Sequence, residues 1–242
     1  MGLDNQNIQQ LYGALARTEA EIAKAVVGKP QVIRHVLTAI LAGGHVLMED
    51  VPGVGKTTLA VAISRVMGME YHRTQFTPDV MPSDVVGFCV YNRETGAKEY
   101  VPGSVMCNLF LADEINRTSS KTQSALLEVM EEGTVTVDGI TRRVPQPFIV
   151  IATQNPVGAA GTQMLPDSQL DRFMIRVSIG YPSEDQEIRM MKDRRSGNPL
   201  DSVQTVMSAV DLLMLRRMAE EVKGGGRPFY FCLGVGKRGG RH

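Results

Sequence analysis

The chain has 242 residues, of which 43% are hydrophobic and 21% charged, which suits a globular protein with one α/β domain and part of a second unit. Its 26 basic side chains balance 26 acidic ones, so no overall charge attracts it to nucleic acid or to an anionic membrane surface. No apolar run approaches the roughly 20 residues of a membrane-spanning helix, and the N-terminus lacks the pattern of a signal peptide, so we expect a cytoplasmic protein without membrane insertion. The cysteines, Cys89, Cys107 and Cys232, have no zinc-ligand spacing, and their odd number argues against a complete set of disulfides.

Helical periodicity, with capping residues or glycine at the ends, marks six segments of the chain. In chain order they cover residues 6–26, 31–41, 57–67, 120–132, 183–195 and 203–222. Between the helices lie five short runs that we interpret as strands; those at 109–112 and 148–152 are continuously apolar, as expected of strands covered on both faces. These runs are 45–49, 71–76, 109–113, 148–152 and 174–179. Strands that alternate with helices predict an α/β fold with a mostly parallel sheet.

Two further segments carry β-like patterns outside this alternation. Residues 77–105 are rich in proline, glycine and polar residues, with short strand-like pieces at 88–91 and 99–101, and we interpret them as an insertion. Asp138-Gly139 lies between two runs of alternating residues and favours the positive φ angles of a tight hairpin turn.

A glycine loop follows the first predicted strand and precedes a predicted helix. Glycines let successive backbone N–H groups turn toward phosphate oxygens, and the helix N-terminus adds partial positive charge. Lys56 can reach the β- and γ-phosphates, and the Thr57 hydroxyl can bind magnesium. The residues predicted to bind nucleotide here are Gly53, Val54, Gly55, Lys56, Thr57 and Thr58. The full motif has glycine where this chain has Asp50, which we interpret as a variant; the alternative is a glycine turn with an exposed lysine.

Asp113 ends the run at 109–113 and lies 57 residues after Lys56, and Glu114 follows it directly. A carboxylate at this point can hold the magnesium shell, and its neighbour can polarise an attacking water. An apolar run followed by Asp-Glu can also be a plain strand end, so its meaning depends on the phosphate loop.

Two polar residues follow the later predicted strands. Asn155 comes after the run at 148–152 and can orient water or the γ-phosphate, although loop asparagines also serve simply as turn formers. Arg172 precedes the last predicted strand and can act as an arginine finger toward a neighbour's nucleotide. Its alternative role is a surface ion pair with Asp171 or Glu131.

In this order the chain carries the motifs GVGKT, LFLADEINR, KTQSALLEVMEEG, ATQNP and LPDSQLDRF. They resemble AAA+ ATPases, and within these the MoxR family, over about residues 10–222. The resemblance implies an AAA+ core whose five-stranded parallel sheet has the order 5-1-4-3-2 and is sandwiched by helices. It divides the chain into a core at 1–182, with a helix-2 insertion at 77–105 and a hairpin before sensor 1 at 133–147, and a partial helical lid at 183–222.

The resemblance also implies ATP and Mg2+ as cofactors, with Thr57 and Asp113 at the metal and Glu114, Asn155 (as sensor 1) and Arg172 (as the finger) in catalysis. Val27 and Gly28 would lie against the adenine. The family forms rings, usually hexamers, and remodels or activates client proteins, often beside a partner with a von Willebrand factor A domain.

One departure concerns the lid. The family's second arginine sensor, in a segment like Gly-Ala-Ser-Pro-Arg, has no counterpart here, and we interpret 223–242 as an aberrant tail that truncates the lid. Two alternatives therefore remain: a nucleotide-binding subunit with little or no turnover, and a magnesium-chelatase-like or DNA-associated motor, which the balanced charge disfavours. No motif in this sequence identifies the client protein.

Overall fold

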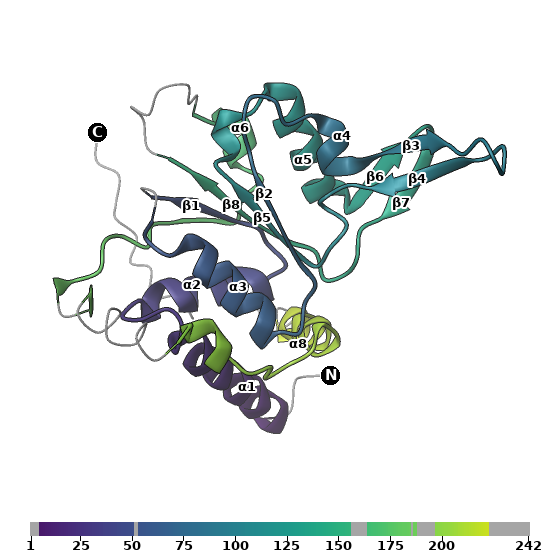
Figure 1. The fold of residues 1–242 in the computed structure, drawn as a ribbon. Coiled ribbons are helices and arrows are strands. Elements are labelled where there is room, and N and C mark those ends of the chain that lie inside the picture. The colour runs from purple at the N-terminus through teal and green to yellow at the C-terminus, as the bar shows by residue number, and fades with distance from the viewer. Residues whose placement is uncertain (1–4, 51–52, 156–163, 185, 188–196, 223–242) are drawn as a thin grey trace, which may run out of the picture.

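The computed structural model describes residues 5–50, 53–155, 164–184, 186–187 and 197–222. Its centre is a five-stranded parallel sheet with the strand order β2-β5-β8-β1-β9 (Figure 1). The strands are β1 (Val46–Glu49), β2 (Tyr71–Gln75), β5 (Leu109–Asp113), β8 (Ile149–Gln154) and β9 (Ile175–Val177). Counted along the chain, this is the order 5-1-4-3-2, and it confirms the predicted sheet.

Both faces of the sheet are covered by helices. One face carries α1 (Asn5–Ala23), α2 (Pro30–Leu41), α3 (Lys56–Val66) and α8 (Ala209–Val222), drawn below the sheet in Figure 1. The opposite face carries α4 (Pro82–Val86), α5 (Ser120–Glu132) and α6 (Asp167–Leu170). The structure also contains two short 3-10 turns, η1 (Ile115–Arg117) and η2 (Pro199–Ser202).

The central strands read as continuous apolar runs because each face of the sheet needs its own apolar side chains. In β5, Leu109 and Leu111 join the core under α2 and α3, whereas Phe110 and Ala112 join the core under α5. The pleat of the strand sends successive side chains to opposite faces, so a strand buried on both sides has no polar alternation. Every residue of β5 and of β8 is buried.

Two antiparallel hairpins project from the α5 side of the sheet (Figure 1). β3 (Gly87–Tyr91) pairs with β4 (Lys98–Pro102) inside the predicted insertion, and β6 (Thr134–Val137) pairs with β7 (Ile140–Arg143). Asp138 and Gly139 have φ angles of 51° and 75°, so the predicted hairpin turn is confirmed. The prediction missed α4, a single short helix near the start of the insertion.

The two hairpins are fastened to each other. The Lys98 ammonium lies 2.9 Å from the Asp138 carboxylate, and the Arg142 guanidinium lies 4.1 Å from the centre of the Tyr100 ring. We call this unit, residues 87–102 and 134–143, the double-hairpin arm. Its exposed large apolar side chains are Phe88, Val90, Tyr91, Val101 and Ile140.

The predicted helix at 203–222 is wrong over its first six residues, because α8 begins only at Ala209. The backbone N–H groups of Val206 and Met207 donate to the Val66 carbonyl at the end of α3, so this stretch is docked as extended chain. The helix then starts where Ser208 and Asp211 cap each other: the Ser208 N–H donates to the Asp211 carboxylate, and the Asp211 N–H to the Ser208 hydroxyl.

Some expectations lie outside the described residues. They include the tail at 223–242 with Cys232, and most of the predicted helix at 183–195. Of that helix the structure describes the start, where Ser183 and Gln186 exchange hydrogen bonds typical of a helix N-terminus. Within the described ranges, no helix combines the length and apolar character needed to cross a bilayer.

A buried histidine joins the sheet to the helix above it. The Val150 N–H donates to Nδ1 of His45 at 3.0 Å, so Nε2 must carry the proton that is shared with the Met130 carbonyl at 3.1 Å. Burial lowers the pKa of His45 below its usual value, because the imidazolium would lose its hydration. The ring is therefore neutral in the folded protein, and protonation would break the bond from Val150.

This arrangement predicts acid-dependent stability. The unfolded chain binds a proton at His45 near pH 6.5 while the folded chain does not, so the free energy of unfolding should fall as the pH drops below about 6.5, by up to ~1.4 kcal/mol per pH unit. Urea unfolding of His45→Gln between pH 7.5 and 5.5 should show a shallower pH dependence than the wild type. His35→Gln, on the half-exposed side of α2, is the matched control. Equal slopes in His45→Gln and the wild type would contradict the assignment.

Candidate functional site

The carboxyl ends of β1, β8 and β5 meet at one edge of the sheet. Glu49 is aligned with Gln154, and Ala112 with Ala152, so the residues that follow these strands start from adjacent positions. The glycine loop follows β1, the acidic pair ends β5, and Asn155 follows β8. In open α/β sheets, ligands bind at this edge.

The loop after β1 leaves space where a phosphate chain would lie. Gly53 and Gly55 have φ angles of 88° and 99°, a region that L-residues with side chains rarely adopt. Among the residues that the structure describes, a β-carbon added at either glycine would meet no atom within 4 Å. Gly55 directly precedes α3, so the unpaired N–H groups of the first helical turn, which contains Lys56, Thr57 and Thr58, border this space.

Lys56 is only 7% exposed, and its ammonium donates to the Asp50 carbonyl at 2.7 Å. Burial lowers the pKa of Lys56, while the carboxylates of Asp113, Asp50 and Glu114 act in the opposite direction. A buried ammonium near three carboxylates and bonded to one carbonyl keeps two donor positions for further oxygens.

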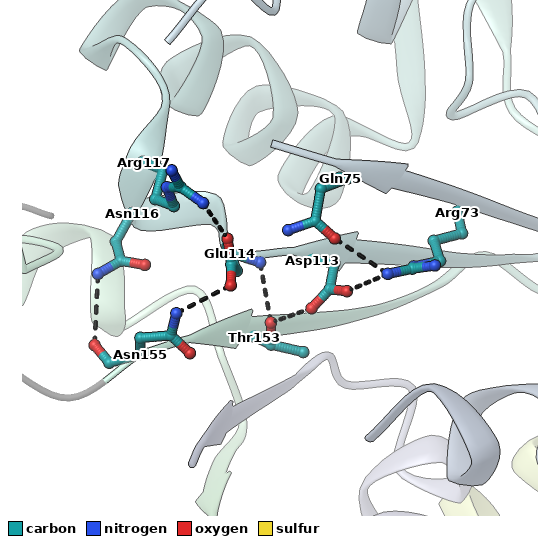
Figure 2. A network of polar contacts seen from close by, with 8 residues as sticks. All are labelled: Arg73, Gln75, Asp113, Glu114, Asn116, Arg117, Thr153 and Asn155. Atoms are coloured by element: carbon teal, nitrogen blue, oxygen red, sulfur yellow. Dashed lines mark hydrogen bonds and ion pairs between the residues drawn. The ribbon is translucent and has the colours of Figure 1, made fainter. Parts of the chain in front are cut away.

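Asp113 is held on both sides (Figure 2). The Thr153 hydroxyl donates to one carboxylate oxygen at 2.6 Å, and the Arg73 guanidinium lies 2.7 Å from the other. Arg73 comes from β2 and also donates to the side-chain oxygen of Gln75. Thr153 in turn accepts the backbone N–H of Glu114 at 2.8 Å, so one hydroxyl fixes both acidic residues.

Glu114 lies in the left-handed region, with φ of 58° and ψ of 46°, an uncommon conformation for a residue with a side chain. Its carboxylate accepts from Arg117 at 2.7 Å and from the Asn155 amide at 2.9 Å (Figure 2). Burial raises the pKa of Glu114, but the bonds from Arg117 and Asn155 and the Arg117 charge outweigh it, so the net pKa is lowered. Glu114 is therefore ionised at neutral pH.

Two amide oxygens beside this carboxylate have no hydrogen-bond partner among the described residues. They belong to Asn155, which is 8% exposed, and to Asn116, which is 2% exposed. Because the Asn155 amide N–H₂ donates to Glu114, its oxygen is left as an acceptor next to an ionised carboxylate. Buried polar atoms without protein partners are satisfied by water or ligand.

These residues fit a nucleotide with magnesium. Among the described residues, no three His, Cys, Asp or Glu side chains are placed to hold a metal ion together, so a metal here would rely on one or two protein oxygens together with phosphate and water. Magnesium is typically held in this way. Thr57 and Asp113 are the side chains that would hold it.

The other predicted residues lie at different places. The Arg172 guanidinium pairs with the Glu131 carboxylate at the end of α5, which is the ion pair given as its alternative role. Gly28, next to Val27, has a φ angle of 75°, and its carbonyl accepts from the Gln186 amide at 3.4 Å. The strands thus bring the glycine loop, Asp113, Glu114 and Asn155 together, while the partner of Arg172 in the described structure is on α5.

Three residues of the site were not foreseen from the sequence: Thr153, Arg73 and Arg117. The position of Thr153 could have been predicted, because it lies in β8, two residues before Asn155. Aligning Ala152 with Ala112 places Thr153 beside Asp113. Arg117 had a weaker one, being three residues after Glu114, within one turn. Arg73 had none, because its contact depends on the pairing of β2 with β5.

Comparison with known proteins agrees with this geometry. The family model described as "ATPase family associated with various cellular activities (AAA)" matches residues 45–175. A crystal structure of a Cytophaga hutchinsonii protein described as a candidate ATPase aligns with a TM-score of 0.78 at 40% identity, covering 86% of this chain and 63% of that one.

Two curated relatives are similar over most of the chain. "Uncharacterized protein YeaC" of Bacillus subtilis is 47% identical over 215 residues, which cover 89% of this chain and 67% of the relative. "Chaperone MoxR1" of Mycobacterium tuberculosis is 41% identical over 205 residues, which cover 85% of this chain and 54% of the relative. The chain thus spans about half to two thirds of the length of the proteins it matches, and it belongs to the MoxR family of AAA+ ATPases.

Proposed function

We propose that the chain binds Mg·ATP at the carboxyl edge of the sheet and hydrolyses it to remodel or activate partner proteins. The observation that carries this is the pair formed by Glu114 and Asn155: an ionised carboxylate and an open amide oxygen, next to Asp113 and the glycine loop. A nucleotide-binding module without turnover would not need an ionised carboxylate beside a free acceptor.

Binding uses the backbone of the glycine loop and one ammonium. The N–H groups at the start of α3 and the Lys56 ammonium donate to phosphate oxygens. To do so, Lys56 gives up its hydrogen bond to the Asp50 carbonyl. Magnesium held by Thr57 and Asp113 would neutralise charge on the phosphates. Thr153 keeps the Asp113 carboxylate oriented toward this position.

Hydrolysis requires a water placed in line with the terminal phosphate. The Glu114 carboxylate takes one proton from that water as the water oxygen bonds to the γ-phosphorus, the bond to the β-phosphate oxygen breaks and ADP leaves. The Asn155 amide oxygen accepts a hydrogen bond from the other O–H of the water. Asn155 donates to Glu114 at the same time, so the two side chains hold each other and share the water. The left-handed backbone of Glu114, fixed by Thr153, aims the carboxylate away from the strand.

The remaining parts of the proposal concern other chains. We propose that the protein forms rings in which Arg172 exchanges Glu131 for the terminal phosphate on a neighbouring subunit. The name of the relative MoxR1 supports a chaperone-like role. Client proteins, or a partner with a von Willebrand factor A domain, would meet the apolar side chains of the double-hairpin arm.

Glu114→Gln separates binding from chemistry. The variant should bind Mg·ADP and Mg·ATP with affinities near those of the wild type, because the amide keeps the size and the bond to Asn155. Turnover should fall by roughly 10²- to 10⁴-fold, since the amide cannot accept the proton. Isothermal titration and a phosphate-release assay measure the two quantities. Glu128→Gln, on the exposed side of α5, is the matched control. Unchanged turnover in Glu114→Gln would remove Glu114 from its role, and absent binding in the wild type would contradict the nucleotide site itself.

Mixing two inactive variants tests whether Arg172 acts between subunits. Arg172→Ala should lose on the order of 10³-fold or more in turnover and retain nucleotide binding. Mixed with Glu114→Gln, it should regain activity, because mixed rings join an intact acidic pair on one subunit to an intact arginine on the next.

Glu131→Gln is the control, since it removes only the ion pair on α5. It should retain most of the wild-type turnover. If Glu131→Gln and Arg172→Ala lose activity equally, and mixing restores none, Arg172 acts through its ion pair and not as a finger.

A further inference from the structure

Asp50, the residue that departs from the glycine of the full motif, joins the start of the phosphate loop to the end of β9, the edge strand next to β1. Its side chain is buried, with the residue 6% exposed, and accepts three hydrogen bonds. The donors are the Ser178 hydroxyl at 2.7 Å, the Gly180 N–H at 3.1 Å and the Ile179 N–H. All three belong to the segment that leaves β9.

A glycine at this position could make none of these bonds. Two of the donors are backbone N–H groups, and buried N–H groups without partners are costly. Bonds to an ionised acceptor are about twice as strong as neutral ones. The carboxylate therefore fixes both its own backbone and the course of residues 178–180.

The backbone carbonyl of the same residue accepts from the Lys56 ammonium at 2.7 Å. One residue thus contacts the two parts of the molecule in different ways: its carbonyl contacts the lysine of the phosphate loop, and its carboxylate contacts the end of β9. The positions of the carbonyl and of the carboxylate depend on each other, because only Cα and Cβ of Asp50 lie between them.

The segment that Asp50 holds also contacts the region around Gly28. The Lys29 ammonium donates to the Tyr181 carbonyl at 2.9 Å, and the Gln186 amide donates to the Gly28 carbonyl. A β-carbon at Gly28 would lie 2.2 Å from the Gln186 side-chain nitrogen, so the packing there is tight. Residues 178–181, together with Gln186, therefore connect the residue before the phosphate loop with the predicted adenine side.

We infer that Asp50 is a positioning residue that couples occupancy of the phosphate site to residues 178–181, the start of the connection toward the C-terminal helices. This rests on the proposed nucleotide function. When Lys56 leaves the Asp50 carbonyl for phosphate oxygens, the carbonyl loses its donor, and the change reaches residues 178–180 through the carboxylate. Coupling between two sites is reciprocal, so weakening the tie also weakens nucleotide binding.

The test combines nucleotide affinity with amide exchange in Asp50→Asn and Ser178→Ala. Asp50→Asn keeps the shape of the side chain but places an N–H₂ group against a backbone N–H donor. Ser178→Ala removes one donor and leaves the two backbone bonds, so it remains informative if Asp50→Asn fails to fold. Titration should show Mg·ADP binding weakened about tenfold or more in Asp50→Asn and less in Ser178→Ala, with a smaller loss of turnover at saturating ATP. Hydrogen exchange of peptides covering 178–181 should slow on Mg·ADP addition in the wild type, and this difference should vanish in Asp50→Asn.

The matched control is Asp84→Asn, in which an exposed carboxylate accepts the Met81 N–H at 2.8 Å within α4. It should leave both readouts at wild-type values. The inference is overturned if Asp50→Asn binds Mg·ADP within twofold of the wild type, or if it keeps the nucleotide-dependent exchange difference. Failure of the wild type to bind Mg·ADP is a different result: it removes the proposed function, and the coupling with it.

Discussion

Three neighbouring parallel strands end at the same edge of the sheet, and the whole candidate site depends on this alignment. β8 is hydrogen-bonded to β1 on one side and to β5 on the other. The glycine loop, Asn155 and Asp113 therefore start from adjacent points, although they are far apart in the chain. The backbone pairing places the groups, and short side-chain bonds, such as that of Thr153 to Asp113, refine them. The apolar residues on both faces of these strands stabilise the pairing and thereby the site.

Two adjacent carboxylates at a partly buried edge repel each other unless positive charge or donors surround them. Here Arg73 pairs with Asp113 and Arg117 with Glu114, while the Lys56 ammonium lies close enough to be affected by both. These partners are ion pairs with half-exposed arginines, which typically contribute little stability and exchange readily. The negative charges of the acidic pair are thus balanced by groups that can give way to a metal ion or to water.

The sheet and the phosphate loop could be read from the sequence because their signals are local. Apolar runs covered on both faces predict buried strands, and glycines between a strand and a helix predict a phosphate loop. The contacts of Arg73 and Asp50 could not be read, since they join residues 40 and about 130 positions apart. The error at 203–208 has a physical cause as well: Val203 and Met207 are buried four residues apart, as on a helix face, but the chain there is docked to the end of α3 by backbone bonds.

The double-hairpin arm is connected directly to the end of α5. α4 and β6 pack together, β6 follows α5 directly after Gly133, and Lys98 with Asp138 holds the two hairpin tips as one piece. A change in the direction of α5 would therefore displace Tyr91 and Ile140, which are 66% and 57% exposed. Glu131, the ion-pair partner of Arg172, lies at the end of α5, two residues before Gly133 and the start of β6, so loss of this ion pair would release the end of α5 at the base of the arm.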